Sequence, residues 1–170
     1  ITMKRALITL SFIVLTIAKV MAVDDYDFSA KCESGQTLYY KITSNREPYT
    51  VSVTYPKHFS IYTGGNSYSD VYYYNYTTPS GDLTIPDTVI NGGIRYAVKS
   101  INYCAFYYCS GLTSITIPNS VTSIDDRAFK YCYGMTEVTI PDSVTEIGIG
   151  AFSNCESLTA VNIPNSVTNI

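Results

Sequence analysis

The feature that most constrains the fold is an internal repeat of 23 residues. Phe106, Phe129 and Phe152 follow one another at this interval. The same interval joins five further columns, which are Ala105, Ala128 and Ala151; Cys109, Cys132 and Cys155; Leu112, Met135 and Leu158; Ile117, Ile140 and Ile163; and Pro118, Pro141 and Pro164. A period of this size is typical of chains whose repeats each form one small unit and stack on their neighbours. The sequence therefore predicts a stack of repeats with a shared core.

Each unit is expected to contain a short strand, a turn and a helical turn. Ile115 and Ile117 alternate with polar residues, as in a strand with one buried face. Pro118 and Asn119 favour a type I turn with the proline at the first central position. A single helical turn is expected at residues 128–132, because two small apolar residues four apart share a face there.

One column predicts an unusual backbone conformation. It contains Asn102, Asp125 and Gly148, which are residue types that tolerate a positive φ. A left-handed backbone is therefore expected at this position in every unit.

The apolar columns together resemble a known family. The pattern AFxxCxxLxxIxIPxxVxxI is present as Ala128-Phe129, Cys132, Met135, Val138, Ile140-Pro141, Val144 and Ile147. It resembles the BspA-type leucine-rich repeat over residues 83–170, and residues 26–43 look like the leader that precedes such repeats in secreted proteins of Bacteroidetes-like bacteria. The resemblance implies a leucine-rich repeat solenoid, mostly β with short helical turns. It also implies a secreted or cell-surface adhesion protein that binds host or matrix proteins without catalysis.

The first repeat departs from the period. Ile85-Pro86 lies 32 residues before Ile117-Pro118, nine more than the repeat length. The insertion at residues 89–98 contains Asn91-Gly92-Gly93 between apolar-alternating arms, which favours a β-hairpin. The repeats are accordingly expected at residues 83–170, with the last one truncated.

A small β-rich N-terminal cap and linker are expected at residues 23–82. Residues 37–43 and 49–55 alternate Tyr, Val, Thr and Ile as strands do. Residues 63–82 are polar and rich in tyrosine, which favours a loop or linker with weaker strand potential at 71–76.

The N-terminal segment predicts secretion. Residues 3–22 begin with Lys4 and Arg5, continue with an apolar stretch at 6–18 and end in small residues, as a signal peptide cleaved after Ala22 would. The alternative is a membrane anchor, but a span needs about 20 apolar residues. No membrane span is therefore expected in the mature chain.

Net charge argues against nucleic acid as a partner. The formal charge is −3 for the whole chain. Loss of Lys4, Arg5 and Lys19 with the signal peptide removes three positive charges and leaves −6. A nucleic-acid partner would require a basic surface.

The chain stops in mid-repeat at Ile170, so a longer reading frame is expected.

Neither catalysis, a cofactor nor a metal site is expected. Three of the five cysteines belong to the repeating column and are expected to be buried thiols. Cys104 shares its column with Arg127 and Gly150, so it is expected to face solvent, and a bond to Cys32 in an oxidising compartment stays open. The only histidine, His58, leaves a nucleophile or a zinc ion without its usual partners.

Two sets of residues are candidates for partner binding. The outward positions of the strands should align into a flat face across the repeats, and they are Ser114, Thr116, Glu137, Thr139, Ala160 and Asn162. Tyrosines at the repeat corners offer rigid apolar area with a polar tip, and they are Tyr107, Tyr108, Tyr131 and Tyr133. Solvated strand positions and half-buried corner tyrosines would give the same pattern. Three hypotheses remain: a protein-binding adhesion module, a glycan-binding module that uses the tyrosines, and an accessory region of a longer secreted enzyme.

Overall fold

The chain folds almost entirely into strands and turns. The computed structural model describes residues 26–64, 67–73 and 76–170, and no α-helix occurs in these ranges. The strands are β1 Phe28–Lys31, β2 Thr37–Ser44, β3 Thr50–Thr54, β4 Phe59–Gly64, β5 Ser67–Val71, β6 Gly81–Thr84, β7 Thr88–Asn91, β8 Ile94–Ile101, β9 Leu112–Thr116, β10 Ser123–Ile124, β11 Glu137–Thr139 and β12 Glu146–Ile147. The predicted signal peptide at residues 3–22 lies outside the described residues. Within them, no helix is long and apolar enough to cross a membrane.

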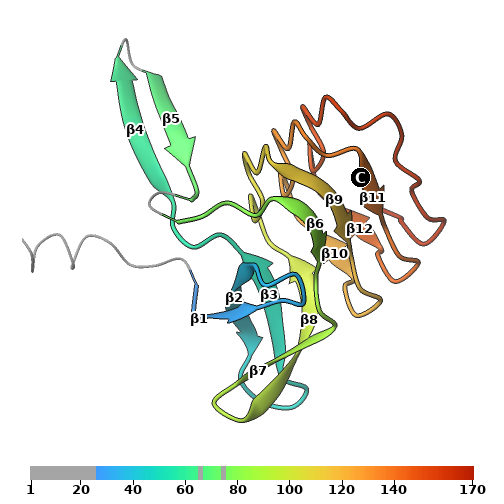
Figure 1. The fold of residues 1–170 in the computed structure, drawn as a ribbon. Coiled ribbons are helices and arrows are strands. Elements are labelled where there is room, and N and C mark those ends of the chain that lie inside the picture. Colours follow the sequence, from blue (N-terminus) through green and yellow to red (C-terminus); the bar gives the residue numbers. More distant parts are fainter. Residues whose placement is uncertain (1–25, 65–66, 74–75) are drawn as a thin grey trace, which may run out of the picture.

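Successive repeats pair through two sets of parallel strands. One sheet has the order β11-β9-β6, and in the other β8, β10 and β12 are neighbours (Figure 1). Leu83 lies opposite Ile115, which lies opposite Val138. All three are buried. Equivalent positions of different repeats therefore lie over one another, as the 23-residue period predicts.

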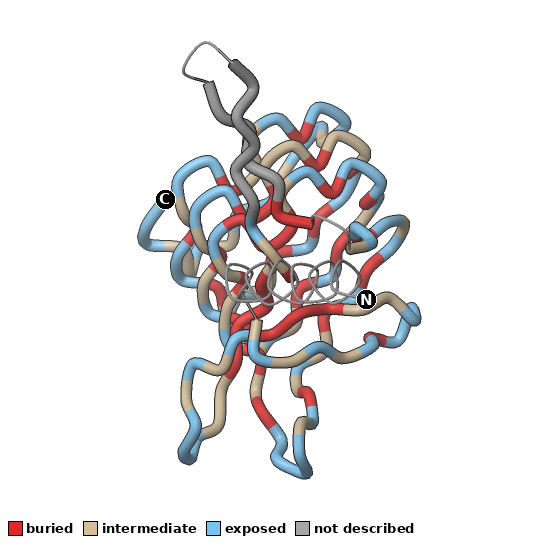
Figure 2. Tube along the Cα trace, turned by 90° about the vertical axis from the view of Figure 1, so that its left-hand side faces the viewer, coloured by how far each residue is buried: buried red, intermediate tan, exposed pale blue. Residues whose placement is uncertain are grey.

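The core consists of side chains stacked from repeat to repeat. The rings of Phe106 and Phe129 lie 5.1 Å apart at an interplanar angle of 4°, and those of Phe129 and Phe152 lie 5.2 Å apart at 6°. The alanine and cysteine columns beside them are buried as well. In Figure 2 the buried segments recur inside the coils, and the exposed segments form the loops. Each layer thus shields the next from water.

The N-terminal strands continue the repeat sheet. β1, β2 and β3 pair antiparallel, and β3 pairs parallel with β8. β7 and β8 form the hairpin expected in the first repeat, with positive φ at both Gly92 (56°) and Gly93 (81°). Two positive φ values in a two-residue loop match the right-handed twist of the paired strands. β3 consequently covers the first repeat with a hydrogen-bonded neighbour.

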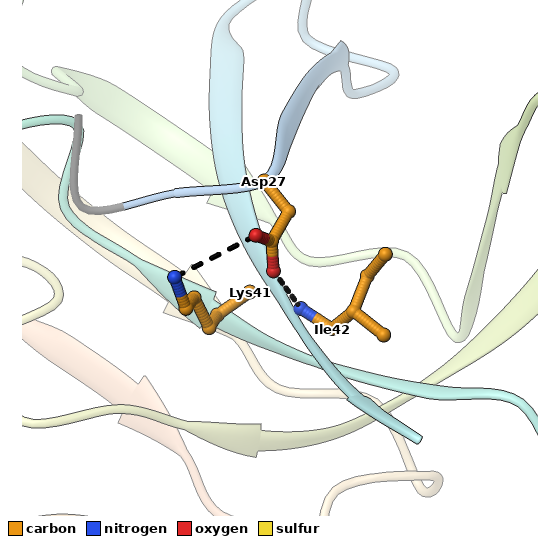
Figure 3. Close-up of polar contacts among 3 residues, drawn as sticks. All are labelled: Asp27, Lys41 and Ile42. Carbon is orange, nitrogen blue, oxygen red and sulfur yellow. Dashed lines mark hydrogen bonds and ion pairs between the residues drawn. The ribbon is translucent and has the colours of Figure 1, made fainter. Parts of the chain in front are cut away.

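Asp27 fixes the start of the first strand. Its Oδ2 accepts a hydrogen bond of 2.7 Å from the backbone N–H of Ile42, and its Oδ1 lies 3.6 Å from Nζ of Lys41 (Figure 3). Because β1 begins only at Phe28, no strand residue can pair with this N–H, and the carboxylate takes that place.

The prediction of a loop at residues 63–82 is wrong in its first part. β4 and β5 form an antiparallel hairpin, with Gly64 opposite Ser67, and Figure 1 shows it projecting from the other strands. The Gly-Gly-Asn run at 64–66 is a hairpin-turn signal in the sequence, and it outweighs the polar composition that favours a linker. The predicted strand potential at 71–76 is also misplaced, because β5 ends at Val71.

The predicted helical turn at 128–132 is absent, and hydrogen bonding explains why. The N–H groups of Phe129 and Tyr131 donate to Ala151 O (2.8 Å) and Ser153 O (3.0 Å) in the next repeat. The alternate N–H groups close tight turns, as Lys130 does to Arg127 O at 3.1 Å. Every second donor therefore joins neighbouring repeats, and a right-handed helix does not form.

The expected left-handed column is also wrong. Positive φ occurs in two other columns, which are Cys104 (53°), Arg127 (55°) and Gly150 (64°), and Tyr108 (63°), Tyr131 (65°) and Asn154 (60°). Glycine is required at position 148 for a different reason, because a Cβ there would collide with the backbone nitrogen of Asp126. The turn after each strand is displaced by one residue as well, because Val121 N–H donates to Pro118 O and makes the proline the first corner.

Candidate functional site

The face of the β6-β9-β11 sheet brings together most of the predicted strand residues. Ser114 lies opposite Glu137, and Thr116 lies opposite Thr139, in parallel register. Glu137, Thr116 and Thr139 are exposed, and Ser114 is half-buried. The inward neighbours Ile115 and Val138 are 2% and 7% exposed. The sheet thus presents aligned polar columns to solvent on one side and packs the core with the other.

The structure adds Asp82 to this face. Asp82 lies opposite Ser114, and its Oδ1 accepts hydrogen bonds from Thr113 Oγ1 at 2.8 Å and Ser114 Oγ at 2.7 Å. These two hydrogen bonds lower the pKa of the Asp82 carboxyl. Sequence reasoning missed Asp82, although aligning Ile85-Pro86 with Ile117-Pro118 places it in the Ser114 column.

The remaining two strand candidates do not belong to a strand of this sheet. Ala160 and Asn162 are exposed but belong to an irregular segment that follows β11 by one repeat. The fourth repeat has an isolated bridge from Asn169 to Glu146 on its other side. The sheet face itself consequently spans three repeats.

The predicted tyrosines form one cluster at the repeat corners. Tyr131 lies 5.4 Å from Tyr107, 5.2 Å from Tyr108 and 5.8 Å from Tyr133, between ring centroids. Tyr108 is 54% exposed, whereas the other three are half-buried. A hydrogen bond with Tyr108 raises the pKa of Tyr133 to about 12, so the Tyr133 phenol stays neutral at physiological pH.

The backbone under two of these tyrosines is strained. Tyr108 and Tyr131 adopt φ of 63° and 65°, and the third repeat has Asn154 at the same position. A left-handed conformation costs an ordinary L-residue about 1–2 kcal/mol, and asparagine tolerates it better. The ring contacts offset this cost, at about 0.5–1.5 kcal/mol per pair.

A groove runs where the strands of this sheet end. Its volume is about 740 Å³. It is lined by Glu33, Thr84, Ile85, Pro86, Asp87, Thr88, Thr116, Ile117, Pro118, Asn119, Thr139, Ile140, Pro141 and Asp142. We call it the threonine groove, after the aligned residues Thr84, Thr116 and Thr139. Since the tyrosines precede the strands and the groove follows them, the two features lie at opposite ends of the sheet face.

The cysteines occupy the core. Cys109, Cys132 and Cys155 are buried, as predicted, and all five cysteines are free thiols. Burial raises the pKa of Cys109, which disfavours its thiolate form. The Cys132 thiol donates to Phe106 O at 3.2 Å. These groups therefore act as small packing residues.

The expectation that Cys104 faces solvent is wrong. Cys104 is fully buried, although Arg127 and Gly150 in its column are exposed. Tyr72 covers Cys104. The pKa of Tyr72 is raised mainly by its burial and also by a hydrogen bond with Cys104. His58 is exposed and stacks on Tyr72 at 4.8 Å. Among the described residues, no three His, Cys, Asp or Glu side chains are placed to hold a metal ion.

Much of the chain matches a protein-family model. The BspA type leucine rich repeat region matches residues 70–170 in six copies. No curated protein sequence matches the chain.

Solved structures resemble the fold over most of the chain. A leucine-rich repeat protein from Bacteroides ovatus is 30% identical with a TM-score of 0.62, and the match covers 84% of this chain and 30% of that one. A leucine rich cell surface protein from Faecalibacterium prausnitzii is 27% identical with a TM-score of 0.56, over 85% and 33% of the two chains. A leucine-rich repeat protein from Bacteroides capillosus is 23% identical with a TM-score of 0.60, over 83% and 86%. The chain spans about a third of the length of the first two proteins.

Proposed function

The chain belongs to the BspA-type leucine-rich repeat family, and from this premise we propose that it is a secreted or cell-surface binding module without enzymatic activity. Its repeats form a solenoid whose exposed face contacts a host or matrix protein. Residues 3–22 act as a signal peptide cleaved after Ala22, residues 23–82 form the N-terminal cap and linker, and residues 83–170 form the repeats.

The observation that carries this proposal is that the β6-β9-β11 sheet has one buried apolar face and one exposed polar face. Ile115 and Val138 point into the core, and Thr116, Glu137 and Thr139 are exposed on the opposite side in register. Extended faces of this kind are the binding surfaces of repeat proteins. Affinity is then expected to come from many shallow contacts across neighbouring repeats.

A matched pair of substitutions tests the proposed face. The purified chain is passed over an array of extracellular matrix proteins, and Glu137→Arg is compared with Glu146→Arg. Both glutamates are exposed strand residues, but Glu137 lies on the β6-β9-β11 sheet and Glu146 on β12 of the other sheet. We expect Glu137→Arg to abolish retention and Glu146→Arg to leave it unchanged. Retention of neither the parent chain nor the control on any matrix protein would contradict the adhesion role.

The tyrosine cluster favours a second candidate, which is binding to a glycan. Tyr108 exposes an aromatic face beside Tyr131 and Tyr133, and such faces stack on apolar surfaces while their hydroxyls form hydrogen bonds. Binding on a glycan array that disappears in Tyr131→Ala/Tyr133→Ala would support this alternative. Unchanged glycan binding in that variant would remove it.

A further inference from the structure

We propose that the threonine groove binds an extended segment of a protein partner that carries lysine or arginine side chains. The inference rests on the proposed protein-binding function and assigns a partner chemistry to one end of the same face. The groove crosses the ends of β6, β9 and β11 and has a volume of about 740 Å³. This volume is ample for several side chains of a peptide.

The floor of the groove offers uncommitted hydroxyl groups. Thr84, Thr116 and Thr139 are exposed and lie opposite one another in the sheet. Within the described ranges, none of their hydroxyls has a hydrogen-bond partner, whereas the hydroxyls of Thr122 and Thr145 donate to carbonyls of the preceding repeat. The three groove hydroxyls are consequently free to bond the backbone of a bound segment, because each can donate and accept.

The rim of the groove is acidic. Asp87 and Asp142 lie in the turns that follow β6 and β11, and Glu33 lines the groove from the turn between β1 and β2. All three carboxylates are exposed, and no lysine or arginine lines the groove. None of the three forms an ion pair within the part of the chain that the structure describes. One cation lies at the edge of the groove, where Nη1 of Arg95 donates to Thr88 Oγ1 at 3.1 Å. The three carboxylates outnumber it, and a concave site lined mainly by one sign of charge attracts the opposite sign.

The wall that carries Glu33 is held in place by hydrogen bonds. The turn closes through Cys32 N–H to Gln36 O at 2.9 Å. Gln36 then joins it to the start of β6, since its Oε1 accepts from Ser80 N–H at 2.8 Å and its Nε2 donates to Asp82 O at 3.4 Å. The groove is thus built by the N-terminal cap together with three repeats, and its two sides are positioned relative to each other.

The spacing of the acids limits the sequence of the bound segment. Neighbouring parallel strands lie about 4.8 Å apart, so Asp87 and Asp142, two strands apart, are separated by roughly 10 Å. A segment in the extended polyproline II conformation rises about 3.1 Å per residue with three residues per turn, so basic side chains three residues apart share a face and lie about 9 Å apart. The aliphatic stems of lysine and arginine can also pack on the Ile-Pro pairs below the rim. An anionic ligand would be repelled by the same rim.

The test uses a fluorescent peptide of ten residues with lysine at every third position and serine or threonine between. Anisotropy titrations measure its binding to the full chain at low and high salt, beside a peptide with acetyl-lysine at the same positions. We expect binding of the lysine peptide that weakens with salt, and at least tenfold weaker binding of the acetylated one. The variant Asp87→Asn/Asp142→Asn should lose at least tenfold in affinity for the lysine peptide.

A matched control separates the groove from overall charge. Glu146→Gln/Glu156→Gln removes the same two charges from exposed positions outside the groove, and it should bind the lysine peptide as the parent chain does. Equal affinity of the two double variants, or equal affinity for the acetylated peptide, would overturn the proposal. Undiminished matrix-protein retention by Asp87→Asn/Asp142→Asn would remove the groove but leave the proposed adhesion role. Peptide binding without retention of any matrix protein would support the groove but remove the proposed adhesion role.

Discussion

Truncation of the middle phenylalanine tests the stacked core most directly. Phe129 is fully buried between two rings, at 5.1 Å from Phe106 and 5.2 Å from Phe152. Phe129→Ala should therefore lower the free energy of unfolding by about 3–5 kcal/mol, through lost burial and the cavity that remains. Phe129→Leu keeps most of the volume but loses two ring pairs, each contributing about 0.5–1.5 kcal/mol, so we expect a loss of about 1–3 kcal/mol.

Phe152 supplies the comparison within the same column. It is only half-buried and is stacked on Phe129 alone among the phenylalanines, so Phe152→Ala should cost roughly 1–2 kcal/mol. Urea unfolding followed by circular dichroism measures all three variants, provided that the slope with denaturant is unchanged. Equal losses for Phe129→Ala and Phe152→Ala would refute the reasoning, because a ring in the middle of a file must bury more than one at its edge.

Three further predictions concern strain, pH and an exposed ion pair. Gly150→Ala should cost about 1 kcal/mol because φ is 64° there, whereas Gly148→Ala should cost more because its Cβ would collide with the preceding repeat; both are measured by urea unfolding. Burial raises the pKa of Asp125, so the folded state holds the proton more tightly than the unfolded state and stability falls as pH rises through that pKa. Asp125→Asn should therefore raise the melting temperature at neutral pH but change it little near pH 3, where both states are protonated. Asp27→Asn should cost under about 1 kcal/mol, since its pair with Lys41 is exposed, and a larger shift in the urea midpoint would contradict this.

The packing of the core was predictable because stacked side chains must recur in the sequence at the repeat interval. A ring at Phe129 can stack on its neighbours only if they lie one repeat away, so the 23-residue interval and the buried column are two expressions of one constraint. The backbone between the strands was not predictable in the same way. The N–H of Phe129 bonds Ala151 O in the next repeat rather than a carbonyl four residues back, and a local pattern cannot show which partner a donor chooses.

Contacts from outside the repeats explain the other differences. Cys104 shares a column with exposed residues but is covered by Tyr72, which lies before the regularly spaced 23-residue units. Glu33 enters the groove for the same reason, since its turn is attached to β6 through Gln36. Periodicity describes only what recurs. A residue in the first repeat, next to a segment that does not recur, takes its environment from long-range contacts instead.

The threonines show why a periodic column does not by itself identify a binding surface. Thr122, Thr145 and Thr168 recur every 23 residues, and the hydroxyl of each donates to a carbonyl of the preceding repeat. Thr116 and Thr139 recur at the same interval, but they lie opposite each other on the exposed side of two paired strands. Among the described residues, their hydroxyls have no hydrogen-bond partner. The hydroxyls of the first column hold neighbouring repeats together. Those of the second column are able to form hydrogen bonds with another molecule. Only the hydrogen-bond partners distinguish them, which is why the sequence predicted a face and the structure was needed to locate the groove at its end.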